Sequence, residues 1–248
     1  MKFSYEGRTI HVNMPDRPSL LAELTRRFRA RQGFALATLN LDHLVKLRSD
    51  PAFRAAYAAH DLVCADGNPI VWLSRLARRP LTLVPGSDLV LPLARLAAKE
   101  GVPVALVGTT DAALAAAAES LARQAPGLRV AARIAPPMGF DPDSPAAGEL
   151  LAQVAQSGAR LCYLALGAPK QERLAARGRQ EAPGVGFVSV GAGLDFLAGS
   201  QTRAPEWVRR LALEWVWRMA SAPRRLVPRY ARCIAILPAE LAAALRQR

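Results

Sequence analysis

The chain has 248 residues, of which 51% are hydrophobic, so it can bury a full core in one main α/β domain with a small appendage. Its formal net charge of +13 predicts an anionic partner: nucleic acid, acidic lipid or a phosphate-bearing substrate. Three widely spaced cysteines, Cys64, Cys162 and Cys233, argue against a disulfide framework and favour reduced thiols in a cytoplasmic protein.

The sequence has no segment typical of membrane insertion. The amino-terminal stretch MKFSYEGRTIHV lacks the apolar core of a signal peptide. No uninterrupted apolar segment reaches the roughly 18 residues needed to span a bilayer. We therefore expect that any action on a membrane takes place from its surface.

From Phe34 onward, short apolar runs alternate with helical stretches. The runs with strand composition are 34–39, 62–66, 102–108, 128–134, 159–166 and 185–191. Helices are expected to begin behind Asp50, after Gly67-Asn68-Pro69, and behind Ser87 and Asp88, and to cover 111–124, 146–157 and 170–181. This alternation predicts βαβ units and a parallel sheet covered on both faces by helices.

Polar residues follow three of the predicted strands, in the segments 38–40, 66–69 and 167–172. We expect them to converge at one edge of the sheet, because ligands of such sheets bind at the carboxyl ends of the strands. Asp66 comes directly after an apolar strand, where partial desolvation would suit it to accept a proton from a hydroxyl nucleophile. Asp66 is therefore the candidate general base, although an Asp here can also serve only to cap the turn before Pro69.

Two glycine-containing turns are candidate phosphate-binding segments. Residues 108–111, Gly-Thr-Thr-Asp, follow a strand and open a helix, so their backbone N–H groups and the helix dipole could hold a diphosphate. The small residues of 191–193, Gly-Ala-Gly, would let a ligand approach the backbone closely. Both patterns also occur in ordinary turns, so each is a weak signal alone.

The region 203–232 is rich in arginine and aromatic residues. Its basic and aromatic side chains are Arg203, Arg209, Arg210, Arg218, Arg224, Arg225, Arg229, Arg232, Trp207, Trp215, Trp217 and Tyr230. A basic helix with aromatic residues suits an anionic membrane interface. An ordinary packing helix with a solvated basic face would have the same composition.

Several chemistries lack their motifs. The histidines are scattered, and no Asp-x-Asp pair stands out except Asp141-Pro142-Asp143, which we interpret as a solvated turn, so no metal site is predicted. There is no GxSxG elbow of an α/β-hydrolase and no GxGxxG fingerprint of a dehydrogenase. No helix-turn-helix, RNP-type or zinc-finger pattern accompanies the positive charge, so nucleic acid is not the expected partner.

Over residues 10–232, these features resemble the WecG/TagA/CpsF family of glycosyltransferases. The matching segments are TLN (38–40), DLVCADGNPIVW (61–72), VPGSDL (84–89), LGAPKQE (166–172), VGAGLDFLAG (190–199) and RAPEWVRRLALEWVWRMASAPRRLVPRY (203–230). They occur in the family's order. The resemblance implies a Rossmann-like parallel sheet flanked by helices, with a basic helical carboxyl-terminal appendage.

The resemblance also implies the reaction: inverting, metal-independent and cofactor-free transfer of a hexose or N-acetylhexosamine-type sugar from a UDP-sugar to a polyprenyl-diphosphate-linked saccharide. Asp66 would be the general base, with Thr38 and Asn40 in the same pocket. Appendage arginines Arg218, Arg225 and Arg229 would meet the substrate diphosphate, with Arg224 as an adjacent possibility. We expect the other substrate contacts to come from Asn68, Gly108, Thr109, Gly167, Lys170, Gln171, Gly191, Gly193 and Asp195.

The predicted organisation is a core over 1–200 and a membrane-associating appendage over 201–248. The resemblance places such a protein peripherally on the cytoplasmic face of the inner membrane, in synthesis of a surface polysaccharide such as exopolysaccharide, capsule or teichoic acid. Two alternatives remain at this stage: a non-catalytic scaffold of the same pathway, and another nucleotide-binding α/β enzyme. The sequence leaves the transferred sugar, the acceptor and the formation of homo-oligomers open.

Overall fold

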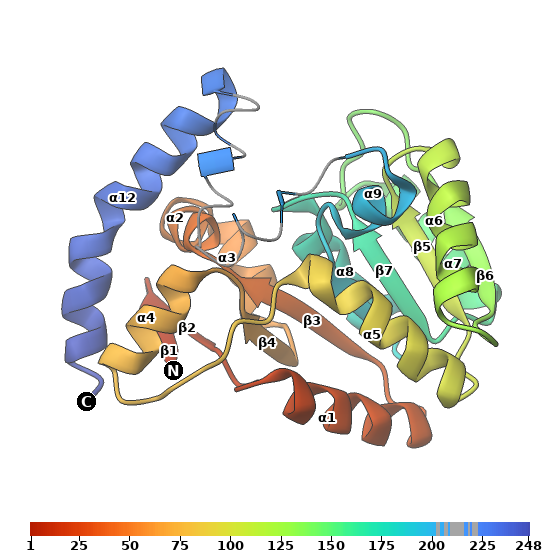
Figure 1. Ribbon diagram of the computed structural model, residues 1–248, viewed down its shortest axis with the longest axis horizontal. Helices are drawn as coiled ribbons and strands as arrows, with labels where there is room; N and C mark the ends of the chain where they lie inside the picture. Colours follow the sequence, from red (N-terminus) through yellow and green to blue (C-terminus); the bar gives the residue numbers. More distant parts are fainter. Residues whose placement is uncertain (202–203, 206–207, 209–215, 218, 220–222) are drawn as a thin grey trace.

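The computed structural model describes residues 1–248 except 202–203, 206–207, 209–215, 218 and 220–222, and the side chain of Arg225 is also outside the description. In the described part, six strands form one parallel sheet in the order β4-β3-β8-β7-β5-β6 (Figure 1). Their bounds are β3 Phe34–Leu39, β4 Leu62–Ala65, β5 Val104–Gly108, β6 Val130–Ile134, β7 Leu161–Ala165 and β8 Gly186–Ser189. The predicted parallel sheet is confirmed, and each strand lies within a predicted run.

Helices cover both faces of the sheet. One face carries α1 Arg17–Arg29, α5 Gly86–Lys99, α6 Asp111–Gln124 and the short α9 Gly193–Ala198. The other face carries α2 Leu41–Ser49, α3 Pro51–Ala58, α4 Asn68–Leu76, α7 Pro145–Gln156 and α8 Lys170–Glu181. The layered α/β architecture of the sequence prediction is therefore confirmed.

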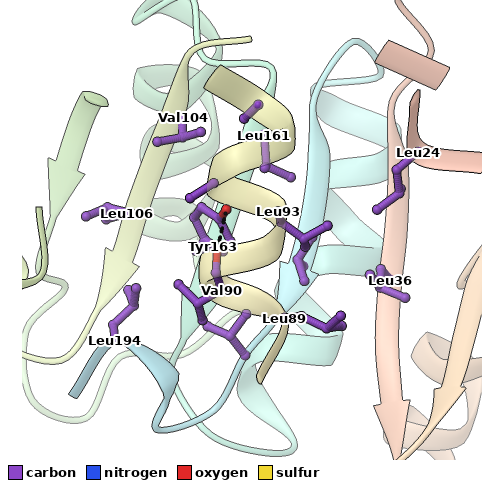
Figure 2. Packing of buried hydrophobic residues seen from close by; sticks show 14 of the residues in the cluster. Leu24, Leu36, Leu89, Val90, Leu93, Val104, Leu106, Leu161, Tyr163 and Leu194 are labelled. Atoms are coloured by element: carbon purple, nitrogen blue, oxygen red, sulfur yellow. Dashed lines mark hydrogen bonds between the residues drawn. The ribbon is translucent and has the colours of Figure 1, made fainter. Parts of the chain in front are cut away.

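The core on the α5 side is centred on Tyr163 of β7 (Figure 2). Its ring is fully buried among Val90, Leu93, Leu106 and neighbouring aliphatic side chains. A buried phenol needs a partner for its hydroxyl group, and the Tyr163 hydroxyl donates to the carbonyl oxygen of Val90 at 3.1 Å. This bond fixes α5 against the middle of the sheet, which in turn positions the first turn of α5.

Two predictions about helix caps have different outcomes. The Asp50 cap is confirmed, because its carboxylate accepts from the backbone N–H of Phe53 at 2.9 Å. The predicted caps of the next long helix are wrong: α5 already begins at Gly86, behind Pro85, and has no side-chain cap. Ser87 and Asp88 therefore lie inside the first turn. Gly101 follows the end of this helix in the left-handed conformation that closes helices.

Elements from both ends of the chain lie together beside β4 (Figure 1). The first two strands, β1 Lys2–Tyr5 and β2 Arg8–His11, form an antiparallel hairpin. The last helix, α12 Pro223–Leu245, packs beside α2 and α4. It buries Leu226, Cys233 and Ala244. Among the described residues, no helix combines the length and the apolar character needed to cross a membrane.

A buried carboxylate holds α12 to the body of the protein. Glu240 is 3% exposed and accepts from the Tyr5 hydroxyl at 2.7 Å and from Nη2 of Arg48 at 2.7 Å. The hairpin, α2 and α12 therefore meet at one carboxylate oxygen. The boundary predicted between a core over 1–200 and an appendage over 201–248 stays a prediction, but the carboxyl-terminal half of that appendage shares a hydrophobic cluster with the core.

Replacing Glu240 by Ala should loosen α12. The variant leaves the Tyr5 hydroxyl and the Arg48 guanidinium without their acceptor, at a cost of about 1–3 kcal/mol in the free energy of unfolding. Hydrogen exchange of the α12 amides should accelerate in Glu240→Ala, whereas Glu149→Ala, which removes an exposed carboxylate on α7, should leave it unchanged. Equal exchange in both variants would show that α12 docks by other contacts.

Candidate functional site

The structure brings most of the predicted site residues to the carboxyl edge of the sheet. Asp66 follows β4, Thr38 and Asn40 stand at the end of β3, and Gly191 follows β8. Beyond them, Gly167 follows β7, and Gly108 and Thr109 close β5. Asn68, Lys170 and Gly193 are the first residues of α4, α8 and α9. The predicted convergence of the strand ends thus follows from the parallel sheet and its order.

Asp66 is bound to β3 through both backbone and side chain. Its N–H donates to the carbonyl oxygen of Leu39 at 2.7 Å, and its Oδ2 accepts from the Thr38 hydroxyl at 3.1 Å. Thr38 is only 4% exposed, so this carboxylate gives its buried hydroxyl group a partner. The N-cap of α4 is Gly67. The two bonds fix the orientation of the Asp66 carboxylate at the strand ends.

Asn40 has a structural role at the same place. It is the N-cap of α2, and its Oδ1 accepts from the N–H of His43 at 3.0 Å. Among the described residues its side-chain nitrogen has no hydrogen-bond partner in the protein. The cap thus holds the amide group in one orientation and leaves its two N–H donors for a ligand.

The first turn of α5 belongs to this site, although its residues were not among the predicted site residues. A Cβ at Gly86 would lie 2.8 Å from the Thr38 hydroxyl oxygen and 2.9 Å from the carbonyl oxygen of Ser189. Only a glycine therefore lets α5 approach the ends of β3 and β8 this closely. The segment VPGSDL carried the signal, since it is one of the segments on which the resemblance rests.

Gln171 connects two of the loops at the sheet edge. Its Oε1 accepts from the N–H of Gly191 at 3.1 Å, and its Nε2 donates to Oε1 of Glu172 at 2.8 Å. Gln171 is 5% exposed and Glu172 is fully buried. Gln171 is therefore a brace between the start of α8 and the loop after β8, a role that the sequence did not indicate.

Burial raises the pKa of Glu172 to about 7. The hydrogen bond from Gln171 and the charge of Lys46 oppose this shift, and the nearby Asp42 carboxylate adds to it. Its Oε2 has no hydrogen-bond partner in the described structure. A carboxyl group in such surroundings changes its charge near neutral pH, directly behind the residue that braces the Gly191 loop.

The predicted phosphate-binding turn after β5 is tied to α9. Thr109 donates to Oδ1 of Asp195 at 2.5 Å, and Asp195 also accepts from the side chains of Ser200 and Gln201, each at 3.1 Å. Gly108 is required by close strand packing, because a Cβ there would lie 2.4 Å from the carbonyl oxygen of Ala165. These residues order the turn, and their contact with a substrate stays a prediction.

The predicted arginines of the appendage are described to different extents. Arg218 lies outside the described residues, and Arg225 belongs to α12 but its side chain is not described. Arg229 lies on α12 with its Nε 2.8 Å from Oδ1 of Asp42, an ion pair without the alignment of a hydrogen bond. Burial pushes the pKa of Asp42 up, but Lys46 and Arg229 outweigh it and hold this pKa below its usual value.

The Asp-x-Asp pair noted in the sequence, Asp141 and Asp143, stabilises a turn in the described structure. In Asp141-Pro142-Asp143, Oδ1 of Asp141 accepts from the N–H of Asp143 at 3.0 Å, and Asp143 pairs with Arg173. Both aspartates are exposed, so the segment is a turn at the surface. The described part of the chain contains no group of three His, Cys, Asp or Glu side chains placed to hold a metal ion.

One comparison with known proteins covers nearly the whole chain. Residues 8–248 match the Glycosyl transferase WecG/TagA/CpsF family. The match includes each strand of the parallel sheet, the edge residues Asp66, Thr38 and Gln171, and α12. It therefore extends over the sheet, the site and the appendage together.

Replacing Glu172 by Gln should remove a pH-dependent cost of folding. Folding raises the pKa of this carboxyl from 4.5 to about 7, so the folded state binds the proton more tightly than the unfolded state. The wild type should therefore lose stability relative to Glu172→Gln as the pH rises from about 4.5 to 7. Above pH 7 this loss should stay constant, on the order of 3 kcal/mol.

Urea unfolding of both proteins between pH 5 and 8 measures this difference. The control is Glu149→Gln, which makes the same substitution at an exposed position on α7. A difference between wild type and Glu172→Gln that does not change with pH would contradict the raised pKa of the buried carboxyl.

Proposed function

The chain belongs to the WecG/TagA/CpsF family of glycosyltransferases, and on that premise we propose the reaction that it catalyses. It transfers a hexose or N-acetylhexosamine-type sugar from a UDP-sugar to a polyprenyl-diphosphate-linked saccharide, with inversion at the anomeric carbon, in the synthesis of a cell-surface polysaccharide. The observation that carries the proposal is the fixed Asp66 carboxylate at the edge of a parallel sheet, held by Thr38 and flanked by Asn40. Such an edge is where α/β sheets bind their ligands.

The chemistry assigned to Asp66 is that of a general base. The acceptor hydroxyl oxygen forms a bond to the anomeric carbon on the face opposite the UDP, and its proton passes to the Asp66 carboxylate. The bond from the anomeric carbon to the β-phosphate oxygen breaks, and its electron pair leaves with the UDP. Because Thr38 holds Oδ2, the carboxylate meets the acceptor in one orientation, which lowers the entropic part of the barrier.

Positive charge offsets the negative charge that grows on the leaving diphosphate. Guanidinium groups suit this task, because their charge is permanent and their fork of donors fits phosphate oxygens. We assign it to Arg218, Arg225 and Arg229 of the appendage. Arg229 is 37% exposed and already faces Asp42, so a diphosphate would compete with this carboxylate for the same guanidinium. With such charges in place, the transfer would not need a divalent ion.

The appendage also supplies the proposed contact with a membrane. In the described part of α12, Arg224 and Arg232 are exposed together with Ile234 and Leu241. Exposed arginine together with large aliphatic side chains on one helix suits an anionic membrane interface. The protein would then work as a peripheral enzyme on the cytoplasmic face of the inner membrane, where lipid-linked acceptors are presented.

Replacing Asp66 by Asn tests the assignment of the base. UDP release is measured with detergent-solubilised polyprenyl-diphosphate-sugar acceptor across a panel of UDP-sugars. Acceptor-dependent release by the wild type identifies the donor. Turnover of Asp66→Asn should fall by about 10²–10⁴-fold, the range for a lost general base, while calorimetric UDP binding persists.

The control for this measurement is Glu149→Gln on α7, which should keep full activity. Normal turnover by Asp66→Asn would refute its role as base. Absence of both UDP binding and UDP release in the wild type would refute the proposed donor class.

A further inference from the structure

The segment 67–87 leaves the candidate site and returns to it. It begins one residue after Asp66, runs through α4 and an extended loop, and returns at Gly86 next to Thr38. The loop passes β4, because the N–H of Val84 donates to the carbonyl oxygen of Ala65 at 2.8 Å. The segment itself contains no Asp or Glu, and the acidic residues that flank it, Asp66 and Asp88, are each nine positions from the nearest arginine of the segment.

Five exposed side chains of this segment form what we call the α4 surface: Trp72, Arg75, Arg78, Arg79 and Leu83. Trp72 is 57% exposed and Leu83 is 40% exposed. In the described structure, none of the three arginines donates a side-chain hydrogen bond or forms an ion pair with a carboxylate. Large apolar groups and cations without a carboxylate partner thus lie together in one short segment. A single exposed hydrophobic residue would need no explanation, but such a group indicates an interaction surface.

The apolar part of the α4 surface lies towards the candidate site. Trp72 is about one helical turn from Asn68, the first residue of α4. Leu83 precedes Val84, which is bonded to the end of β4 just before Asp66. The arginines lie at the far end of α4 and in the following loop, where Arg79 is close enough to the amino-terminal amine to lower its pKa, after the larger effect of burial.

The α4 surface adjoins the helix of the appendage. α12 packs beside α4 on the side of the molecule away from α6 and β6 (Figure 1). Nε of Arg248, just beyond α12, donates to the carbonyl oxygen of Leu76 at 2.9 Å. α12 exposes Ile234 and Leu241 to solvent. Apolar exposed groups are therefore present on both neighbouring helices.

We propose that the α4 surface is a second membrane contact, within the core itself, and that its partner is an anionic lipid bilayer. Trp72 and Leu83 enter the headgroup region, and Arg75, Arg78 and Arg79 bind lipid phosphates. Tryptophan is favoured at the depth of the lipid headgroups, and the negative surface potential of the bilayer adds to the binding free energy of each arginine. A nucleic acid would satisfy the arginines but would leave the aliphatic groups of Leu83 and α12 in water.

This inference rests on the proposed function and extends it. A single helical contact would let the core rotate relative to the bilayer, whereas contacts at both α4 and α12 fix its orientation. Because both ends of segment 67–87 lie at Asp66 and Thr38, binding of the α4 surface to the bilayer would bring these two residues close to the bilayer. A polyprenyl-linked acceptor could then reach Asp66 without leaving the membrane.

Vesicle co-sedimentation of the full-length protein tests the proposal, with vesicles of phosphatidylethanolamine and phosphatidylglycerol. One variant removes the charges, Arg75→Gln/Arg78→Gln/Arg79→Gln, and a second removes the apolar groups, Trp72→Ser/Leu83→Ser. One control, Arg123→Gln/Arg129→Gln/Arg133→Gln, removes the same charge from exposed positions on and between α6 and β6, on the other side of the molecule. A second control, Met138→Ser, removes an exposed apolar side chain.

Both α4 variants should lower the vesicle partition coefficient by on the order of tenfold or more, and the controls should lower it much less. High salt should reduce the binding of the wild type and narrow its difference from the arginine variant. In a protein with Trp72 as its single tryptophan, the fluorescence should shift to shorter wavelength on vesicle binding. Wild-type affinity in both α4 variants, or an unshifted Trp72 emission in the bound protein, would overturn the proposal.

Two further measurements separate other outcomes. Loss of duplex DNA binding in the arginine variant, with unchanged vesicle binding, would overturn the lipid assignment in favour of nucleic acid. Transfer to a water-soluble acceptor with a short prenyl chain should be equal in wild type and α4 variants. If the wild type binds vesicles through the α4 surface but neither binds UDP nor releases it from any UDP-sugar, the proposed function fails and the membrane contact stands.

Discussion

The site depends on one constraint: the central strands of the sheet are covered on both faces, so polar side chains have room almost only where the strands end. Five of the six strands of the parallel sheet are buried along their whole length: β3, β4, β5, β7 and β8. The sixth, β6, lies at one edge of the sheet and is partly exposed. Thr38 is the polar residue inside β3, and it is tolerated because Asp66 accepts its hydrogen bond. The parallel pairing sets this contact. Thr38 lies opposite Cys64, and Asp66 follows Cys64 by two residues, so its side chain points to the same face of the sheet as that of Thr38.

The strands could be predicted because burial on both faces makes each of them a continuous apolar run. The hairpin was not predicted, since β1 and β2 have four residues each and bury one side chain each, Phe3 and Ile10. Such short segments carry too little pattern to distinguish a strand from a loop. The helix behind Asn40 was also missed, because Asn40 was interpreted only as a site residue although it caps α2. The caps assigned to α5 were wrong for a related reason: Ser and Asp are favoured caps, but close packing against Thr38 and Ser189 requires Gly86 at the start of this helix.

The convergence of the candidate residues at the strand ends could be predicted, but their contacts could not, and their roles stay predictions. Asp66, Thr38 and Gln171 were proposed from strand ends and motifs, whereas the bond from Gln171 to Glu172 depends on how α8 packs under the sheet edge. A buried carboxylate is costly when it is charged, and Glu172 has a partner for only one of its oxygens in the described structure. Stability is thus given up directly behind the loop that Gln171 braces, and natural proteins accept such a cost mainly at functional sites.

The ion pair between Arg229 and Asp42 links α12 to the helix that follows Asn40. Asp42 lies two residues after Asn40, in the first turn of α2, and Arg229 comes from α12. Glu240 joins α12 to α2 a second time through Arg48. Movement of α12 would therefore be transmitted to the helix that Asn40 caps. In the proposed reaction, a substrate diphosphate that bound Arg229 in place of Asp42 would leave this carboxylate paired with Lys46. Substrate binding and the position of α12 would then be coupled through Asp42.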